Sequence, residues 1–220
     1  MDGNGRLDTV GSGASKAYFD FNDDGISERC GWIAPQDGLL AIDSNGNGHI
    51  DGLGALFGSD TLDGFAGLAA YDSDGNGCID GNDAVYGRLL MWRDLNQDGI
   101  SQSGELSGLA ELGITRIGLA SNATSEAAWD NRIIATGSFM RYGKTELVGD
   151  IELAIDSRWT DSNPNRPLEQ APDLAAEVYS LPWLRGYGEV KSLHVAYMER
   201  PELRQSARSL LAGGWAGVLS

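Results

Sequence analysis

The feature that most constrains this chain is a short loop, repeated along its first half, in which Asp or Asn alternates with Gly. The clearest copy covers residues 94–105 and places oxygen-bearing groups at loop positions one, three, five, seven and twelve, with glycine at six. The residues at these ligand positions are Asp94, Asn96, Asp98, Ile100 (through its carbonyl) and Glu105. Calcium binds about 6 to 8 oxygen atoms, and a twelfth-position Glu can supply two of them. The pattern therefore predicts an EF-hand-type calcium loop.

A second complete loop begins 22 residues earlier and covers residues 72–83. Its expected ligands are Asp72, Asp74, Asn76, Cys78 (through its carbonyl) and Asp83. The segment 84–93, between the two loops, has helical length and apolar spacing. The sequence therefore predicts that the two loops share one helix, as paired EF-hands do.

Two less complete loops lie nearer the N-terminus. One would use Asp43, Asn45, Asn47 and His49 (through its carbonyl), but it has Gly54 and Ala55 where an acid is expected to close the site. The other would use Asp20, Asn22, Asp24 and Ile26 (through its carbonyl), with Glu28 or the distant Asp37 as its closing acid. In addition, residues 2–8 look like positions three to nine of a further loop, whose first ligand would precede Met1.

The charge balance favours cations as partners. The chain has 32 Asp and Glu against 16 Lys and Arg, a formal charge of -16, which argues against nucleic acid and against an anionic membrane surface. Its 41% hydrophobic content is enough for a buried core. The sequence has neither an apolar stretch of membrane-spanning length nor an N-terminal signal-peptide core. We therefore expect export to be directed from elsewhere, and the chain to be a piece of a longer protein.

Several residues that could suggest other chemistry have plainer interpretations. Cys30 and Cys78 are expected to be free, and zinc is not expected because no second Cys or His stands at ligand spacing from Cys78. The side chains of His49 and His194 are interpreted as passive. Five aromatic residues could suggest sugar binding but are expected mostly in the core: Trp92, Trp129, Trp159, Trp183 and Tyr187. The sequence shows no Ser/His/Asp constellation with a supporting motif and no phosphate loop, so the catalytic residues stay unknown.

The order of the segments predicts an α+β fold with EF-hand-like loops and short helices, a small antiparallel β hairpin or sheet, and a C-terminal helical tail. The hairpin is expected from residues 132–141 and 145–153 around a turn at Tyr142-Gly143-Lys144, with a further strand over 114–119. The expected division is a calcium-binding module over 1–157, a polar linker over 158–166 and a helical tail over 167–220. The tail helices are expected over 173–180, 188–198 and 201–211.

Calcium is the expected cofactor, and it would act as a folding switch. Many carboxylates in adjacent loops repel one another, so the chain should be loose without calcium and compact with it. Each site bound only in the folded state adds about 2.7 kcal/mol of stability at a hundredfold excess of ion over its Kd.

Several motifs, in order along the chain, resemble a specific family. They are Phe19-Asp-Phe-Asn-Asp-Asp-Gly-Ile, Gly31-Trp, Asp37-Gly-Leu-Leu, Asp43-Ser-Asn-Gly-Asn-Gly, Leu56-Phe-Gly and Trp92-Arg-Asp-Leu-Asn-Gln-Asp-Gly-Ile-Ser. This set resembles the self-processing module of large, iron-regulated, RTX-type proteins secreted by Gram-negative bacteria. The segment Leu184-Arg-Gly-Tyr-Gly-Glu-Val-Lys-Ser-Leu-His resembles the helical tail common in such proteins.

The resemblance implies calcium-dependent autocatalytic cleavage of an Asp-Pro bond at the upstream edge of the module. The Asp carboxylate attacks its own carbonyl to give a cyclic anhydride, which either water or a Lys amine opens. The implied partners are calcium ions and a Lys-bearing protein that accepts an isopeptide bond, and the implied location is extracellular or the bacterial cell surface, without membrane insertion. This chain departs from the family because it contains no Asp-Pro bond and carries Ala55 where an acid is usual. RTX nonapeptide repeats are also missing.

Two other functions stay open from the sequence. One is a non-catalytic, calcium-stabilised spacer or adhesin segment. The other is a dockerin-like module that binds a partner, which the 22-residue spacing of the paired loops suggests and which would need a binding surface on the expected helix at 84–92.

Overall fold

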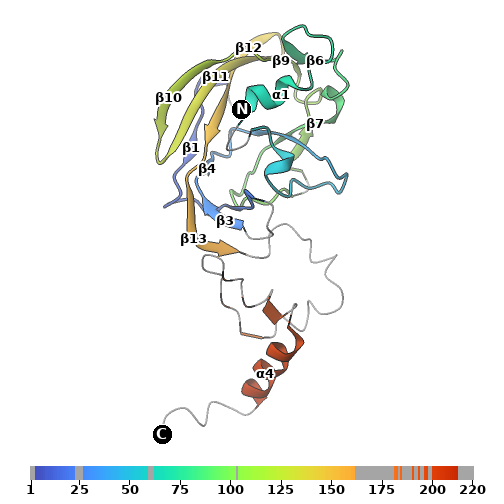
Figure 1. The fold of residues 1–220 in the computed structure, drawn as a ribbon. Helices are drawn as coiled ribbons and strands as arrows, with labels where there is room; N and C mark the ends of the chain where they lie inside the picture. Colours follow the sequence, from blue (N-terminus) through green and yellow to red (C-terminus); the bar gives the residue numbers. More distant parts are fainter. Residues whose placement is uncertain are drawn as a thin grey trace.

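The computed structural model describes residues 3–22, 27–58, 62–102, 104–161, 181–182, 184, 190, 193, 196–197 and 200–212. Within these residues the chain is built mainly from antiparallel β-strands (Figure 1). The strands are β1 Thr9–Val10, β2 Tyr18–Phe19, β3 Ser27–Cys30, β4 Trp32–Ile33, β5 Leu39–Ile42, β6 Cys78–Asp80, β7 Leu89–Trp92, β8 Leu106–Gly108, β9 Ile114–Gly118, β10 Asn122–Ala128, β11 Asn131–Arg141, β12 Lys144–Glu152 and β13 Ile155–Asp161. The helices among them are α1 Gly64–Ala69 and α4 Pro201–Ala212, with 3-10 turns η1 Leu53–Ala55 and η2 Tyr86–Arg88.

The largest sheet is organised by one long hairpin. Strands β11 and β12 pair from Arg141 and Lys144 outward, and the two turn residues Tyr142 and Gly143 have φ values of 48° and 74°. Two positive φ values in a two-residue turn match the right-handed twist of the strands on either side. On its other edge β11 pairs with β10 and β9, and β9 pairs with β6. The hairpin and the strand expected over 114–119 are therefore confirmed.

Three smaller sheets complete the β structure. Their strand orders are β5-β7-β8, β13-β3-β2 and β1-β4. An aromatic cluster lies among them, in which the ring centroid of Trp32 is 5.5 Å from that of Phe19 and 5.5 Å from that of Trp92. All three side chains are fully buried. This cluster is the centre of one apolar core, and a second core contains Leu89, Ile114 and residues packed around them.

The expected α+β, EF-hand-like fold is wrong. The described residues are mostly strand, and the helix expected over 84–93 is instead η2 followed by β7. Residues 89–92 are an uninterrupted apolar run, which suits a buried strand as well as a helix. In the fold they pair with β5, with Leu89 opposite Ile42 and Trp92 opposite Leu39. A helix of this length is marginal by itself, so sheet pairing and burial decide its structure.

The C-terminal part is described only in places. Strand β13 pairs with β3 as far as Asp161, so residues 158–161 of the expected linker are strand, while residues 162–166 lie outside the described residues. The helix expected over 173–180 also lies outside them, as does His194, and only a few residues of 188–198 are described. Helix α4 occupies the place of the third expected helix. The division into module, linker and tail stays a prediction.

Several individual expectations are settled within the described residues. Cys30 and Cys78 are free and buried. Trp92 is buried, whereas Trp129 and Trp159 are 80% and 47% exposed, so these two lie outside the core that most of the five aromatic residues were expected to occupy. Trp183 and Tyr187 lie outside the described residues. In the part of the chain that the structure describes, no helix combines the length and the apolar character that a bilayer span needs.

Candidate metal centre

Three of the predicted loops share one backbone arrangement. In each, the amide of the glycine at position six donates to the carboxylate of the aspartate at position one. The nitrogen–oxygen distances are 2.8 Å for Gly99 and Asp94, 3.0 Å for Gly77 and Asp72, and 2.8 Å for Gly48 and Asp43. In each, the position-seven amide also donates to the side-chain oxygen at position five. Those distances are 2.9 Å for Ile100 and Asp98, 3.0 Å for Cys78 and Asn76, and 2.8 Å for His49 and Asn47.

Left-handed backbone at position six makes this tight turn possible. Position six is a glycine in all three loops, with φ of 78° at Gly99 and at Gly77 and 82° at Gly48. Only glycine adopts this conformation without steric cost, so the repeated glycines are required by the turn. The local Asp/Asn/Gly pattern therefore specifies the loop conformation, independently of which strands flank the loop.

The two complete loops are closed in the same way by their position-twelve acids. The carboxylate of Glu105 accepts the amides of positions two and nine, Leu95 and Gln102, both at 3.0 Å. The carboxylate of Asp83 accepts the corresponding amides of Ser73 and Asp80, at 2.7 and 3.0 Å. These two hydrogen bonds hold each closing carboxylate beside the ligand positions of its own loop.

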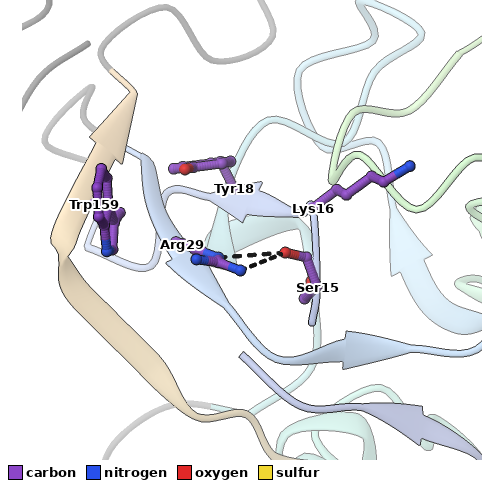
Figure 2. Close-up of a pocket in the computed structure, with 5 residues that line it drawn as sticks. All are labelled: Ser15, Lys16, Tyr18, Arg29 and Trp159. Atoms are coloured by element: carbon purple, nitrogen blue, oxygen red, sulfur yellow. Dashed lines mark hydrogen bonds between the residues drawn. The ribbon is translucent and has the colours of Figure 1, made fainter. Parts of the chain in front are cut away.

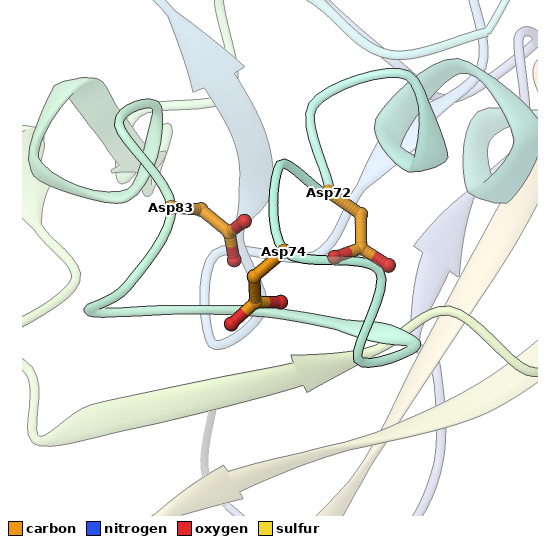
Figure 3. A group of neighbouring side chains, drawn as sticks. All are labelled: Asp72, Asp74 and Asp83. Carbon is orange, nitrogen blue, oxygen red and sulfur yellow. The ribbon is translucent and has the colours of Figure 1, made fainter.

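In the loop at residues 72–83 three carboxylates converge. One oxygen from each of Asp72, Asp74 and Asp83 lies within 4.8 Å of the others (Figure 3). Asp83 is buried while Asp74 is exposed, so this site opens to solvent on one side. Hydrogen bonds from the amides of Asp80 and Ser73 lower the pKa of Asp83, which keeps it ionised. The cluster offers only oxygen donors, which suits a hard cation.

The loop at residues 94–105 is different because its first ligand is inside the core. Asp94 has no exposed surface, and the indole nitrogen of Trp32 donates to its carboxylate at 2.7 Å. Burial raises the pKa of Asp94, and the nearby charges of Asp98 and Glu105 raise it further. Among the described residues no Lys or Arg forms an ion pair with Asp94. Asp94 therefore places a buried charge near two further acids without a protein cation, although among the described residues only the loop at 72–83 brings three carboxylates together.

The loop at residues 43–51 lacks a closing acid but is tied to a neighbour. The side-chain amides of Asn45 and Asn47 both donate to the carboxylate of Asp51, at 3.1 and 2.7 Å. The amide of Ile50, at position eight, donates to the hydroxyl of Ser101 at 2.8 Å. Ser101 is position eight of the loop at residues 94–105, so these two loops are the ones that face each other.

The expected pairing of the loops at 72–83 and 94–105 is therefore wrong. Ile79, at position eight of the former, lies in β6 and pairs with Ile117 of β9. The reason is the missing helix: without it, η2 and β7 lead the chain away from β6 into another sheet. Neither Ser101 nor Trp32 was identified as a site residue from the sequence, because both act through partners far away along the chain.

The loop expected around Asp20 is only partly described. Asp20 is buried and accepts the amide of Asn22 at 3.3 Å, whereas Asp24 and Ile26 lie outside the described residues. Glu28 lies in β3, where it pairs with Phe19. The structure places the other suggested closing acid, Asp37, at a different loop.

Asp37 lies at the N-terminal half-loop. The amide of Asp8 donates to the Asp37 carboxylate at 2.8 Å, which is the bond that position nine makes to the closing acid in the complete loops. The side-chain amide of Asn4 donates to Asp8 at 2.8 Å, and the amide of Arg6 donates to Asn4 at 2.7 Å, as at the equivalent positions elsewhere. Residues 3–8 therefore repeat the loop conformation, with an acid from a distant segment in the closing place.

The comparisons with known proteins agree with this order of motifs. The model of the SPM domain matches residues 1–154. The chain is also 36% identical over 206 residues to the iron-regulated protein FrpA of Neisseria meningitidis serogroup C. That alignment covers 89% of this chain but 18% of the relative, so the chain spans less than a fifth of that protein's length. On the strength of the domain match, the chain belongs to the SPM domain family.

Proposed function

We propose that this chain is a calcium-binding module of a secreted, RTX-type protein and that it folds on binding calcium. The observation that carries the proposal is the burial of Asp94. Its carboxylate has no exposed surface, lies close to Asp98 and Glu105, and has only neutral hydrogen-bond donors: the indole of Trp32 and the loop amides. A buried carboxylate without a counter-charge costs several kcal/mol, so a cation at this position would relieve a large energetic cost.

The residues around the loops fit calcium. In the loop at residues 94–105 the ion would be held by the side chains of Asp94, Asn96, Asp98 and Glu105 and by the carbonyl of Ile100. In the loop at residues 72–83 it would be held by Asp72, Asp74, Asn76 and Asp83 and the carbonyl of Cys78. Oxygen donors of this number suit calcium better than magnesium, which retains most of its water. The half-loop at residues 3–8, with Asp37, offers a smaller set of the same kind.

Calcium would supply charge compensation and a mechanical link between sheets. Strand β7 enters the loop at residues 94–105 and β8 leaves it. From the loop, the carbonyl of Asp98 accepts the amide of Tyr18 at 3.4 Å, and the side-chain amide of Gln97 donates to the carbonyl of Ile33 at 3.0 Å. The loop thus contacts segments from two other sheets. Ordering it would order the sheets, which makes folding depend on the ion.

The test is calcium-dependent folding of the purified chain. In calcium we expect a high melting temperature and a strong near-UV dichroism signal, because the buried rings of Trp32 and Trp92 are then fixed. In EDTA we expect both to fall, and magnesium at the same concentration is not expected to restore them. Retention of both signals in EDTA, with no metal recovered from the protein, would contradict the proposal.

We further propose that the module promotes cleavage of an Asp-Pro bond in the parent protein ahead of residue 1. This finer function rests on the family resemblance and on the position of the half-loop at residues 3–8, which is held by Asp37 at that edge of the module. Calcium bound there would order the segment that carries the bond. Opening of the resulting anhydride by water would release two fragments, and opening by a Lys amine would form an isopeptide.

The experiment joins the parent protein's own upstream segment, with its Asp-Pro bond, to this chain and follows fragments on a denaturing gel after calcium is added. We expect calcium-triggered cleavage, at least tenfold slower cleavage in Asp37→Asn, and no change in Glu126→Gln. Glu126 is exposed on β10 and belongs to none of the predicted loops, so its variant is a matched loss of one charge. Calcium-dependent folding without cleavage would instead support the spacer or adhesin function. The dockerin-like alternative loses the binding surface that it needed, since η2 and β7 replace the helix expected at 84–92.

A further inference from the structure

A pocket of about 360 Å³ lies where the β13-β3-β2 sheet meets the turn before β2. It is lined by Ser15, Lys16, Tyr18, Arg29 and Trp159. Figure 2 shows the ring of Tyr18 above Arg29 and Trp159 to one side of both, while the Lys16 side chain extends away on the other side. None of these residues belongs to a predicted calcium loop. A pocket of this volume is within the range of small-molecule sites.

The pocket is positively charged although the chain is strongly acidic. The guanidinium of Arg29 is fixed by the carbonyls of Gly13, at 2.8 Å, and Ser15, at 3.2 and 3.3 Å. Its cross-strand neighbour Asp156 is hydrogen-bonded to Arg158, at 2.8 and 2.9 Å, and is also near enough to Arg29 for the guanidinium to help lower the pKa of Asp156. Lys16 is exposed and forms no ion pair among the described residues. Two cations thus line one pocket: Arg29, held in place by main-chain carbonyls, and Lys16, an exposed side chain at its rim.

The pocket also presents flat apolar surfaces. Trp159 is 47% exposed, which is unusual for a side chain that could contribute strongly to a core. It lies on β13 at a register shift between Asp156 and Thr160, and this irregularity is what turns the strand locally. Tyr18 lies opposite Arg29 on β2, so the ring and the guanidinium share one face of the sheet. Aromatic faces beside cations can bind a ligand that has both an apolar ring face and a negative charge.

We propose that this pocket binds an acidic sugar, meaning a pyranose that carries a carboxylate. The carboxylate would pair with Arg29 and Lys16, and the C–H face of the ring would stack on Trp159. A simple anion would make no use of the rings. An acidic peptide that added to the β2 edge would find the amide of Tyr18 already donating to Asp98. The combination of features therefore favours a compact, charged ring.

The pocket rests on a calcium loop. The amide of Tyr18 bonds the carbonyl of Asp98, and Gly99 packs so closely on Tyr18 that a β-carbon there would overlap the Tyr18 carbonyl oxygen. Tyr18 is thus positioned by the loop at residues 94–105. We expect sugar binding to weaken when calcium is removed, an expectation that rests on the proposed calcium function.

The first experiment measures binding of sodium D-glucuronate to the whole chain in calcium, by saturation-transfer NMR and calorimetry. D-glucose, sodium acetate and an acetylated tetraglutamate peptide are the comparison probes. We expect glucuronate to bind at least about tenfold more tightly than glucose or acetate, because each of these lacks one half of the recognition. The peptide is expected to bind no better than acetate.

The second experiment uses matched variants. Trp159→Ala is expected to weaken glucuronate binding about tenfold and Lys16→Gln about threefold, with Trp159→Phe close to the parent chain. The controls are Trp129→Ala and Lys144→Gln, which change an exposed Trp and an exposed Lys near the two turns that flank β11. Neither control is expected to change binding, and melting temperatures in calcium check that each variant folds.

The outcomes separate this proposal from the calcium proposal. Absence of glucuronate binding at millimolar concentration in a chain that still melts calcium-dependently would overturn the sugar site alone. Equal binding of glucose or acetate, tighter binding of the peptide, or equal losses in the control variants would also overturn it. Binding that persists unchanged in EDTA would overturn the link through Tyr18, and calcium-independent melting of the same sample would count against the calcium proposal.

Discussion

The loops at residues 72–83 and 94–105 have nearly the same backbone but opposite surroundings. The first is on the edge of the molecule, with Asp74 and Asn76 exposed. The second begins with Asp94 inside the aromatic core, hydrogen-bonded to Trp32. The same local sequence pattern therefore forms a loop at the surface in one place and a loop that is part of the core in another. What differs is what the loop contacts, so the energetic consequences of losing an ion should differ too.

Asp94→Asn should have the largest effect, and its sign should depend on calcium. In calcium we expect a loss of about 3 kcal/mol in unfolding free energy, because the first ligand of a core site is removed. In EDTA at pH 7 we expect the variant to be at least as stable as the parent chain. The folded-state pKa of Asp94 is raised, so the ionised carboxylate opposes folding above the unfolded-state pKa, and neutral Asn removes that penalty.

This reversal is measured by urea titrations with and without calcium. Lowering the pH in EDTA should narrow the difference between Asp94→Asn and the parent chain, since protonation relieves the same penalty. A variant that is destabilised equally in calcium and in EDTA would show that Asp94 acts only through its hydrogen bonds.

Asp72→Asn should have a smaller effect, mainly in calcium. We expect a loss of about 2 kcal/mol there, from one site bound in the folded state alone. In EDTA a smaller loss is expected, because Asp72 is half-buried and Asn keeps the oxygen that accepts the amides of Gly75 and Asn76 but loses the acceptor of the Gly77 amide. Calcium calorimetry should show one site fewer while near-UV dichroism stays close to that of the parent chain. Collapse of the aromatic signal in this variant would contradict the peripheral role.

The alkylation rates of the two cysteines test the same difference between the surface loop and the core. Cys78 lies in the loop at residues 72–83, and Cys30 lies in the aromatic core. Both are fully buried, and burial raises the pKa of each thiol, so both should react slowly in calcium. In EDTA we expect alkylation of Cys78 to become about tenfold faster. This corresponds to a free energy of local opening of the loop that is about 1.4 kcal/mol lower than in calcium. Peptide mapping after iodoacetamide treatment distinguishes the two sites, and equal rates in calcium and EDTA would count against a loosened loop.

Ser101→Ala should have the smallest effect and should act on the contact between loops. It removes the acceptor of the Ile50 amide, which is buried, and we expect a loss of about 1 kcal/mol. Hydrogen exchange of that amide should speed up while exchange in residues 72–83 stays unchanged. Faster exchange in both places would mean that all the loops are coupled, contrary to the arrangement of the sheets.

The sequence predicts the parts of this molecule that are decided locally. Glycine at position six and acids at one and twelve define the complete loops, and Gly143 defines the hairpin turn. The strand conformation of residues 89–92 could not be predicted from the sequence. An apolar run of this kind is compatible with a helix or a strand, and only its pairing with β5 decides between them. The role of Asp37 depends on a contact 29 residues away along the chain, which no local pattern encodes. The exposure of Trp159 could not be predicted for a related reason, because Trp159 lies at an irregularity in the pairing of β13 with β3.

The last strand has a consequence for how the fold is completed. Strand β13 pairs with β3, joining Ile155 to Cys30 and Asp161 to Ser27 across most of the module. Such long-range pairing gives a high contact order, which slows folding. It also means that the domain match, which ends at residue 154, stops one residue short of a strand that the β3 edge requires. A fragment cut at that boundary should leave one edge of β3 unpaired and prone to self-association, whereas a fragment extended to Asp161 keeps that edge paired with β13.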